Sequence, residues 1–344
     1  MNNQGFPVLG APPAQSVMEL AWGMWGSSLV QAAARLDVAE AVGDEPVEIG
    51  ELAKRLSADP DALFRMMRAL AGYGIFRYAG PRSFEHTEAS RALRSDAPIQ
   101  IRDIILIAAD WGPVVWSKLA ETVRTGQSAF RTQFGKNLME YCAQDDQQAG
   151  YHLMHGYAAQ VEAMNPALVD AIDVAGVDLV ADIGGGHGTL MRSLLERHAS
   201  LHGILFDTEL TLKSADQPLK TGPLAERCRL VPGDIMRSVP AADLYLIRQV
   251  LHMWDDDTCV RALRNCADAA GPGSRLIVIE QLISDPPEFP YDGLMDVHML
   301  LVMEGRERGE GDFRELFERA GWRLRGITKT TTPLRLIEAS WNSG

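Results

Sequence analysis

Apolar and polar residues follow two different periods along this chain of 344 residues. Up to about residue 165, apolar positions recur every three or four residues, which is typical of amphipathic helices. From Pro166 onward, short apolar runs alternate with helical stretches, which predicts strands and helices in turn. We therefore expect a mostly helical N-terminal part followed by an α/β domain over residues 166–344.

The N-terminal part begins with residues 1–14, which are rich in Gly and Pro and are predicted to be a flexible lead-in. A helix is expected from Gln15, with Val17, Leu20, Met24 and Trp25 at helical spacing. The two tryptophans of this segment need an apolar partner surface. They either pack on the protein's own core or form a subunit interface, and we favour the interface.

The segment after this helix has a winged-helix pattern, so residues 15–100 are predicted to be one domain. Two amphipathic helices, 46–56 and 61–70, are joined by a link in which Asp59 caps and Pro60 starts the second helix. A hairpin is expected over residues 78–87. Winged helices often bind DNA, but arginines and carboxylates are mixed in this segment: Arg65, Arg68, Arg77, Arg82, Glu48, Glu51, Asp59 and Asp61. We therefore do not expect nucleic-acid binding.

Residues 101–165 are predicted to be a helical linker. Aromatic and Met side chains suit the walls of an apolar pocket, although ordinary helix packing also explains each of them. A joint to the next domain is expected at Asn165-Pro166. The candidate substrate-binding residues here are Trp111, Trp116, Met154 and Tyr157.

Seven strand candidates follow the joint, at residues 179–183, 202–206, 228–231, 243–247, 275–280, 323–328 and 334–339. The first five alternate with helices and should lie parallel. Only Thr330–Pro333 separates the last two, which should pair as an antiparallel edge. Such a sheet presents ligand groups at the carboxyl ends of its strands.

A glycine-rich turn follows the first strand and contains Gly184, Gly186 and Gly188 after Asp182. It lacks the Lys-Ser/Thr of a phosphate-cradling loop, and Thr189 stands where a dinucleotide fingerprint needs its last glycine. Glycines here permit positive φ and close approach of a ligand. The turn predicts a nucleotide-like cofactor.

Carboxylates follow the next two strands. Asp207 lies 19 residues after Gly188, where a carboxylate can accept both hydroxyls of a ribose, and Asp234 could hold an adenine amino group. Each could instead be a helix N-cap.

Five ordered motifs resemble the small-molecule O-methyltransferases of the plant caffeic-acid type and their bacterial natural-product relatives, which belong to the class I S-adenosylmethionine-dependent enzymes. The motifs are the glycine turn, Phe206-Asp207, Gly233-Asp234-Ile235, Leu251-His252-x-Trp254-x-Asp256 and Glu307-Arg308-x-Glu310-x-x-Phe313. The resemblance implies a Rossmann-like sheet, S-adenosylmethionine as cofactor with S-adenosylhomocysteine as product, and a homodimer formed by the winged-helix domain.

The resemblance also implies roles for single residues. His252 would be the general base, Glu280 the carboxylate on its second ring nitrogen, and Glu310 a second glutamate. Trp254 would cover the adenine and Arg248 would contact the outer rim of the cofactor, unless both are structural. The remaining implied residues are Asp182, Gly184, Gly186, Gly188, Asp207, Thr208, Gly233, Asp234 and Ile235 for the cofactor, and Asp296, Met299 and Met303 for the substrate.

Two positions depart from the family pattern. Met253 replaces the usual Asp or Asn between the His and the Trp, and Thr208-Glu209 replaces the usual Leu-Pro. A metal site made of His252, Glu280 and His298 would suit a C-methyltransferase acting on an enolised keto acid. No metal-binding signature is present, so no metal is expected.

The net charge is −13, from 33 Lys and Arg against 46 Asp and Glu, which disfavours nucleic-acid partners. The four cysteines form no CxxC pair, no secretory signal is evident, and no apolar run is long enough to span a membrane. A cytoplasmic protein is expected.

The sequence predicts a dimeric enzyme that methylates a hydroxyl of a small aromatic metabolite, such as a phenol, a polyketide or a phenazine. The alternatives are C- or N-methylation, a non-methylating reaction that uses the bound cofactor, and a winged-helix DNA-binding regulator.

Overall fold

The computed structural model describes residues 13–98, 101–286 and 290–341, without the side chains of Pro13, Met154, His155 and Pro290. The chain forms two compact units. The first comprises Met1–Val114 and Asp146–Gln160, and the second Val115–Asp145 and Val161–Gly344. The predicted helical linker 101–165 is thus divided between the two units.

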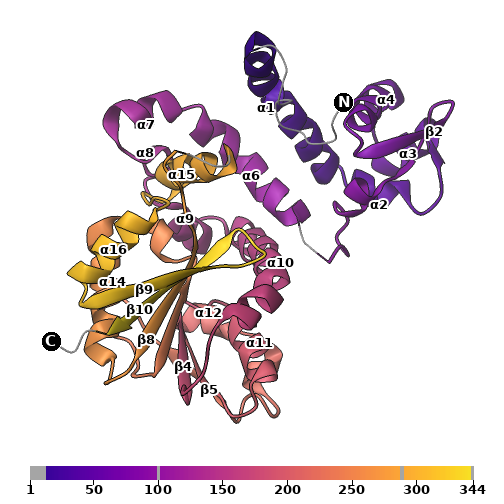
Figure 1. Ribbon diagram of the computed structural model, residues 1–344. Coiled ribbons are helices and arrows are strands. Elements are labelled where there is room, and N and C mark those ends of the chain that lie inside the picture. Colours follow the sequence, from indigo (N-terminus) through magenta and orange to yellow (C-terminus); the bar gives the residue numbers. More distant parts are fainter. Residues whose placement is uncertain (1–12, 99–100, 287–289, 342–344) are drawn as a thin grey trace. The chain divides into compact units, whose positions relative to one another are not determined.

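The second unit contains a seven-stranded sheet with the order β6-β5-β4-β7-β8-β10-β9 (Figure 1). Strands β4 to β8 pair in parallel, and β10 runs antiparallel to both β8 and β9. The predicted Rossmann-like sheet is confirmed. Its strands are β4 (Leu179–Ile183), β5 (His202–Asp207), β6 (Cys228–Pro232), β7 (Leu244–Arg248), β8 (Arg275–Gln281), β9 (Trp322–Lys329) and β10 (Leu334–Trp341).

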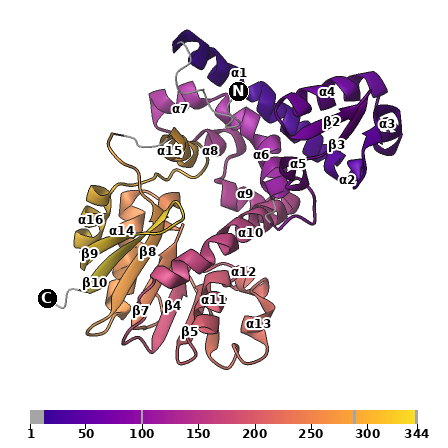
Figure 2. The same cartoon turned by 45° about the vertical axis from the view of Figure 1, so that its right-hand side comes forward.

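Helices cover both faces of this sheet (Figure 2). One face packs against α14 and α16 through a core that includes Leu263, Phe313 and Trp322. The other packs against the end of α10 and against α11, α12 and α13, with Leu168 and Leu194 buried. The bounds of these helices are α10 (Gln147–Ala171), α11 (Thr189–Arg197), α12 (Glu209–Lys213), α13 (Gln217–Lys220), α14 (Asp256–Ala269) and α16 (Glu310–Arg319).

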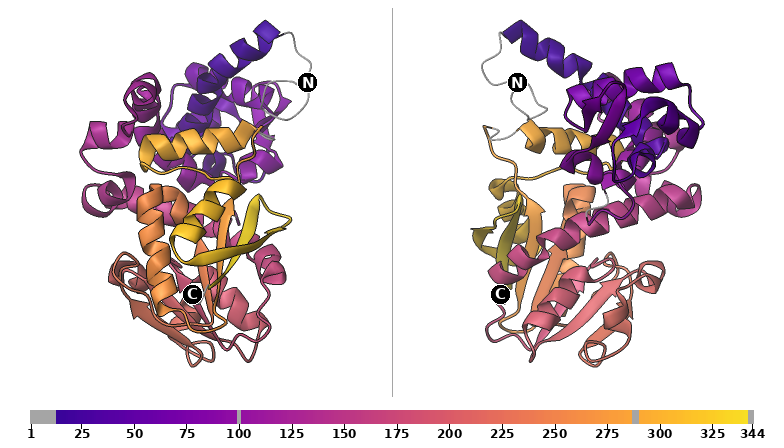
Figure 3. Two further views of the ribbon diagram at one scale, coloured as in Figure 1. Left: turned by 60° about the vertical axis from the view of Figure 1, so that its left-hand side comes forward. Right: turned by 90° about the vertical axis from the view of Figure 1, so that its right-hand side faces the viewer.

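A group of helices in the same unit lies beyond the sheet (Figure 3). Helix α8 packs against α15, where the Ser128 hydroxyl donates a hydrogen bond of 2.8 Å to the carbonyl of Leu301. The elements of this group are α7 (Leu119–Thr125), α8 (Ala129–Phe134), α9 (Leu138–Gln144) and α15 (Pro290–Val302).

The predicted joint at Asn165-Pro166 is wrong, because both residues lie inside helix α10. Pro166 removes one backbone donor from the helix. The helix nevertheless continues, because Leu168 and Val169 bury their side chains against the sheet and Asn165 is only 1% exposed. Tertiary packing here outweighs the local signal of the proline.

The first unit is mostly helical. A core of buried residues such as Leu52, Met67 and Phe84 joins its helices to a three-stranded sheet of order β1-β3-β2. Its elements are α1 (Pro13–Arg35), α2 (Val38–Val42), β1 (Val47–Glu48), α3 (Ile49–Leu56), α4 (Pro60–Gly72), β2 (Phe76–Gly80), β3 (Ser83–His86), α5 (Glu88–Arg91) and most of α6 (Ile101–Trp116). Because α1 begins at Pro13, the predicted lead-in ends two residues too late; residues 1–12 lie outside the described part.

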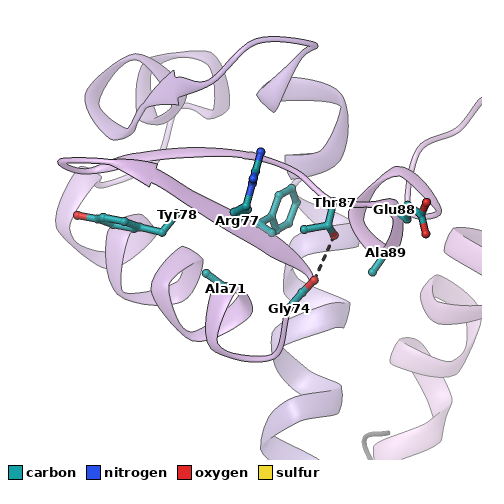
Figure 4. Close-up of a pocket in the computed structure, with 8 residues that line it drawn as sticks. Ala71, Gly74, Arg77, Tyr78, Thr87, Glu88 and Ala89 are labelled. Carbon is teal, nitrogen blue, oxygen red and sulfur yellow. Dashed lines mark hydrogen bonds between the residues drawn. The ribbon is translucent and has the colours of Figure 1, made fainter. Parts of the chain in front are cut away.

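The predicted cap and hairpin of this unit are both present. Asp59 accepts the backbone N–H groups of Asp61 and Ala62 at 3.1 and 2.8 Å, and β2 pairs with β3. The Thr87 hydroxyl donates to the carbonyls of Gly74 and Ile75, which fastens the end of the hairpin to the end of α4 (Figure 4).

Three of the four arginines that could have served DNA binding have other partners in this unit. Arg77 pairs with Glu85, and the guanidinium groups of Arg82 and Arg68 lie 4.1 and 5.6 Å from the centre of the Phe64 ring.

Helix α1 keeps its apolar side chains exposed in the single chain. Leu20 is 70% exposed, Met24 68% and Trp25 59%, and Trp22 stacks on Trp25 with ring centres 5.6 Å apart. These tryptophans therefore do not belong to the core of the first unit. Among the described residues, no helix combines the length and apolar character that crossing a bilayer requires.

Candidate active site

The glycine turn after β4 has the backbone conformation that its sequence predicts. Gly184, Gly186 and Gly188 have φ values of 70°, 59° and 79°. A Cβ on Gly184 would lie 2.9 Å from a methyl of Val250, whereas a Cβ on Gly186 would meet nothing within 4 Å. Gly184 is therefore required by packing, and Gly186 borders open space where a ligand can approach the backbone.

Asp207, at the end of β5, closes this turn. Its carboxylate accepts the N–H of Gly186 at 2.9 Å and the N–H of Thr208 at 2.7 Å. Each oxygen keeps a second lone pair, so the carboxylate can still accept a ligand hydroxyl. The Thr208 hydroxyl itself caps helix α12 by accepting the N–H of Thr211.

Asp182 lies beneath the turn and is only 1% exposed. Burial, reinforced by the charge of Asp207 and opposed by that of Arg248, raises the pKa of Asp182 to about 7. Its Oδ1 atom has no hydrogen-bond partner among the described residues. A buried polar atom without a partner is costly, so this oxygen marks a place where a ligand donor fits.

Arg248, at the end of β7, is buried rather than placed at an outer rim as predicted. Its Nη1 donates to Asn165 Oδ1 and its Nη2 to the carbonyl of Val161, both at 2.7 Å. Burial lowers the pKa of Arg248 to about 10, which leaves it charged at neutral pH, while Asp182 opposes this shift. The sequence predicted the residue but not its anchor on helix α10.

Gly233 and Asp234 directly follow β6. A Cβ on Gly233 would fall 2.3 Å from the Phe206 ring, so only glycine fits. Asp234 is half exposed and accepts the N–H of Met236 at 2.9 Å, in a turn rather than a helix cap. Ile235 and Trp254 are partly buried against the same apolar cluster as Phe206.

His252 lies in a short 3₁₀ turn, η1 (Leu251–Met253), after β7. Its Nδ1 is 2.9 Å from Oε1 of Glu307, and its backbone N–H donates to Oε1 of Glu280 at 3.1 Å. Burial acts to lower the pKa of His252, but the hydrogen bond to Glu307 and the charges of both glutamates outweigh it and raise the pKa. Nε2 makes no hydrogen bond to any residue within the described ranges.

The two glutamates are each 1% exposed, and each has one oxygen, Oε2, without a partner in the described part of the chain. Burial raises the pKa of Glu280, although His252 and Arg308 oppose the shift and Glu307 adds to it. The ring nitrogen of His252 is thus held by Glu307. The predicted partner, Glu280, holds the backbone of the turn instead.

The prediction for Glu310 is wrong. Its side chain is 58% exposed on the outside of α16 and pairs with Arg314 at 2.8 Å, one helical turn away. The buried glutamate of this motif is Glu307, three residues earlier. The next residue, Arg308, forms a β-bridge with Leu282, which follows β8.

Two family models match the chain. One, described as an O-methyltransferase domain, matches residues 116–323, and the other, described as an O-methyltransferase dimerisation domain, matches residues 18–96. The chain belongs to the O-methyltransferase family. It is an S-adenosylmethionine-dependent methyltransferase.

Relatives of known name align with nearly the full length of this chain. The phenazine O-methyltransferase PhzM of Lysobacter antibioticus is 31% identical over 334 residues, covering 96% of this chain and 97% of that protein. The phenazine-1-carboxylate N-methyltransferase of Pseudomonas aeruginosa is 28% identical and covers 95% and 97%. The solved structure of the mitomycin 7-O-methyltransferase MmcR has a TM-score of 0.89 at 31% identity, covering 95% and 97%.

The residues of the methyltransferase fit S-adenosylmethionine. Gly186 borders open space, Asp207 retains lone pairs for hydroxyls, and Asp182 has a buried oxygen without a partner among the described residues. Apolar side chains at the ends of β5, β6 and β7 suit an adenine ring. The cofactor would be held by these groups and would supply a methyl group on a positively charged sulfur.

The candidate substrate-binding residues are divided between the two units. Trp111 is buried and Tyr157 is 39% exposed, both in the first unit; the side chain of Met154 lies outside the described part. In the second unit, Trp116 stacks on His298 with ring centres 6.1 Å apart.

Three further candidates lie on or after α15. Met299 is buried and Met303 is half-buried. Asp296 accepts the backbone N–H of Glu307 at 2.8 Å, so it holds the segment whose carboxylate contacts His252.

The cluster of potential metal ligands differs from the one considered above. Within the described residues, ligand atoms of His252, Glu280 and Glu307 lie within 4.8 Å of one another, and His298 is not part of this group. Burial and the charge of His252 lower the pKa of His298 to about 4, which keeps its imidazole neutral at physiological pH.

Glu307 and Arg308, which contact His252 and the turn around it, were not predicted as site residues from the sequence. Both were part of the quoted motif, and consecutive charged residues before a helix are usually exposed. The bridge of Arg308 to Leu282 turns this segment inward. Only a predicted pairing between it and the end of β8 could have revealed this.

Changing Asp207 to Asn tests the cofactor site. Asn keeps an oxygen for the Gly186 N–H but loses the charge, so we expect S-adenosylmethionine to bind about 10- to 100-fold more weakly in calorimetry. Glu209→Gln, two residues away and exposed, is the matched control and should bind normally. Unchanged affinity in the Asn variant would contradict the assignment of Asp207.

Proposed function

We propose that this methyltransferase transfers a methyl group to a hydroxyl of a small aromatic metabolite, with His252 as general base. The observation that carries the proposal is the contact of 2.9 Å between His252 Nδ1 and Glu307 Oε1. A carboxylate acceptor keeps the proton of a neutral imidazole on Nδ1. Nε2 then carries the lone pair that a base needs.

The pKa values of a phenol and of a histidine support this role. A phenol, with a pKa of about 10, is a weak nucleophile at neutral pH, and a histidine near its ordinary pKa of about 6.5 can accept its proton as attack begins. The proton moves from the substrate oxygen to Nε2, and the imidazolium that forms is stabilised by Glu307. The raised pKa of His252 strengthens the base.

An aromatic acceptor is supported by the second unit and by the relatives. Trp116, stacked on His298, offers a flat apolar surface, and Met299 and Met303 offer pliable side chains. The relatives named above act on phenazine and mitomycin compounds according to their names. A small aromatic natural product is the acceptor class that we infer for this chain.

N-methylation is the second candidate, because one relative is named as a phenazine N-methyltransferase. A pyridine-type ring nitrogen, such as that of a phenazine, carries no proton to remove and needs no base. Loss of turnover on removing His252 therefore favours the hydroxyl acceptor, and the product's connectivity, read by NMR, separates the two reactions.

Replacing His252 by Ala should lower kcat about 10²- to 10⁴-fold with a phenolic acceptor, because the base is lost. Cofactor affinity should stay the same. The control is His202→Ala, at the exposed start of β5. A His252→Ala enzyme that turns over at the rate of the control would show that this imidazole is not the base.

Replacing Glu307 by Gln should lower kcat about 10²-fold or more, because the tautomer and the imidazolium lose their support. Since Glu307 raises the pKa of His252, its loss should shift the acid limb of the kcat/KM profile to lower pH. Glu310→Gln is the matched control and should leave both rate and profile unchanged. A loss of rate in Glu310→Gln together with a normal rate in Glu307→Gln would restore the assignment of Glu310.

We also infer that the first unit forms a homodimer through α1. The dimerisation model matches residues 18–96, and Leu20, Met24 and Trp25 expose apolar surface that a partner would cover.

The double change Leu20→Glu and Trp25→Glu should convert the dimer to a monomer in light scattering. Val123→Glu, at a 70% exposed position of the second unit, should leave the mass unchanged. A dimer that survives the double change would place the interface elsewhere.

A further inference from the structure

Arg308 is a charged side chain with no exposure to solvent, and the proposed function gives it no role. Its Nη1 donates to the carbonyl of Leu251 at 2.9 Å and its Nη2 to the carbonyl of Trp254 at 2.7 Å. Nε and Nη2 also donate to Oδ1 of Asp256, at 2.9 and 2.8 Å. The two carbonyls bracket His252 and Met253, so one guanidinium holds both ends of the turn that carries the base.

The residues before Arg308 contact the middle of the same turn, at the backbone carbonyl of His252. The N–H of Arg306 donates to the carbonyl of His252 at 3.0 Å. A Cβ on Gly305 would lie 2.0 Å from that carbonyl oxygen, so the backbone of this segment is in direct contact with the turn. On its other side, Ile283 donates its N–H to the carbonyl of Arg308 at 3.2 Å, which ties the segment to the chain after β8.

Glu307 and Arg308 are consecutive in this segment. The carboxylate that holds the imidazole ring and the guanidinium that holds its backbone therefore belong to one short piece of chain. Any shift of the segment moves both supports of His252 together. A general base works only while its nitrogen stays within hydrogen-bond reach of the substrate hydroxyl.

We propose that Arg308 is a positioning residue, which fixes the 251–254 turn against Glu307 so that His252 keeps its reactive geometry; this inference rests on the proposed role of His252 as base. The planar fork of arginine is required, because three acceptors on the turn and on α14 lie around it in different directions. A lysine has one nitrogen and cannot hold all three with the same geometry. Asp256 neutralises the buried charge.

The test replaces Arg308 by Lys in the full-length enzyme. We expect kcat to fall about 10- to 100-fold, because small displacements of a catalytic group are costly, while the Kd for S-adenosylmethionine and the KM for the acceptor stay within about threefold. If Arg308 had only a structural role, its replacement would lower the stability of the enzyme and would not lower kcat at constant KM.

Arg227 provides the matched control. It also donates to three backbone carbonyls, those of Leu195, His198 and Leu201, but it lies between α11 and β6, away from the base. Arg227→Lys should lower the thermal midpoint and leave kcat unchanged. Equal kcat in the two lysine variants would overturn the proposal.

Two further measurements keep the outcome decisive. If Arg308→Lys does not fold, the variant Asp256→Asn weakens the hold of Asp256 on Arg308 and leaves Arg308 in place. In that variant too, kcat is expected to fall while KM stays the same. A normal kcat in Asp256→Asn would overturn the proposal. His252→Ala, measured beside them, separates the two hypotheses. If it retains full turnover, the proposed function fails, whereas loss of turnover in His252→Ala with normal kcat in Arg308→Lys overturns only the role of Arg308.

Discussion

Two buried carboxylates and one buried guanidinium surround a single imidazole at the carboxyl end of the sheet, and their charges constrain the whole site. Glu280 and Glu307 both raise the pKa of His252, and the positive charge of Arg308 opposes them. Buried charges are tolerated only when they are paired and hydrogen-bonded. His252 therefore cannot be considered apart from the segment 305–308, which supplies both its acceptor and its clamp.

The cofactor half of the site depends on the same strand. Arg248 ends β7 and His252 follows four residues later, so one strand and the turn after it carry both the buried guanidinium and the imidazole. Val250, between them, fills the space that a Cβ on Gly184 would need. The residue that precedes the 251–254 turn is thus packed against the glycine turn.

Most of the fold could be predicted from the sequence, because each strand candidate was bounded by a turn signal and alternated with a helical period. The glycine turn and Asp207 were found for the same reason, because they lie where strands end, whereas His252 was found through the family resemblance of its motif. Glu307 and Arg308 could not be placed, since neither follows a predicted strand and their burial depends on long-range contacts with Leu282, His252 and Asp256. Glu307 is buried just before α16, and Glu310, the first residue of α16, is exposed. No local sequence pattern shows which of the two glutamates is the buried one. The joint at Pro166 failed because packing of Leu168 against the sheet overrides the local preference of proline.

We infer that Glu307 fixes the proton of neutral His252 on Nδ1 and raises the pKa of this imidazole. Long-range proton–nitrogen NMR of the enzyme labelled with ¹⁵N-histidine, assigned by comparison with His252→Ala, measures both properties in one pH titration. We expect a neutral ring protonated at Nδ1, with a pKa above the ordinary value of about 6.5. A ring protonated at Nε2, or a pKa below that value, would contradict it.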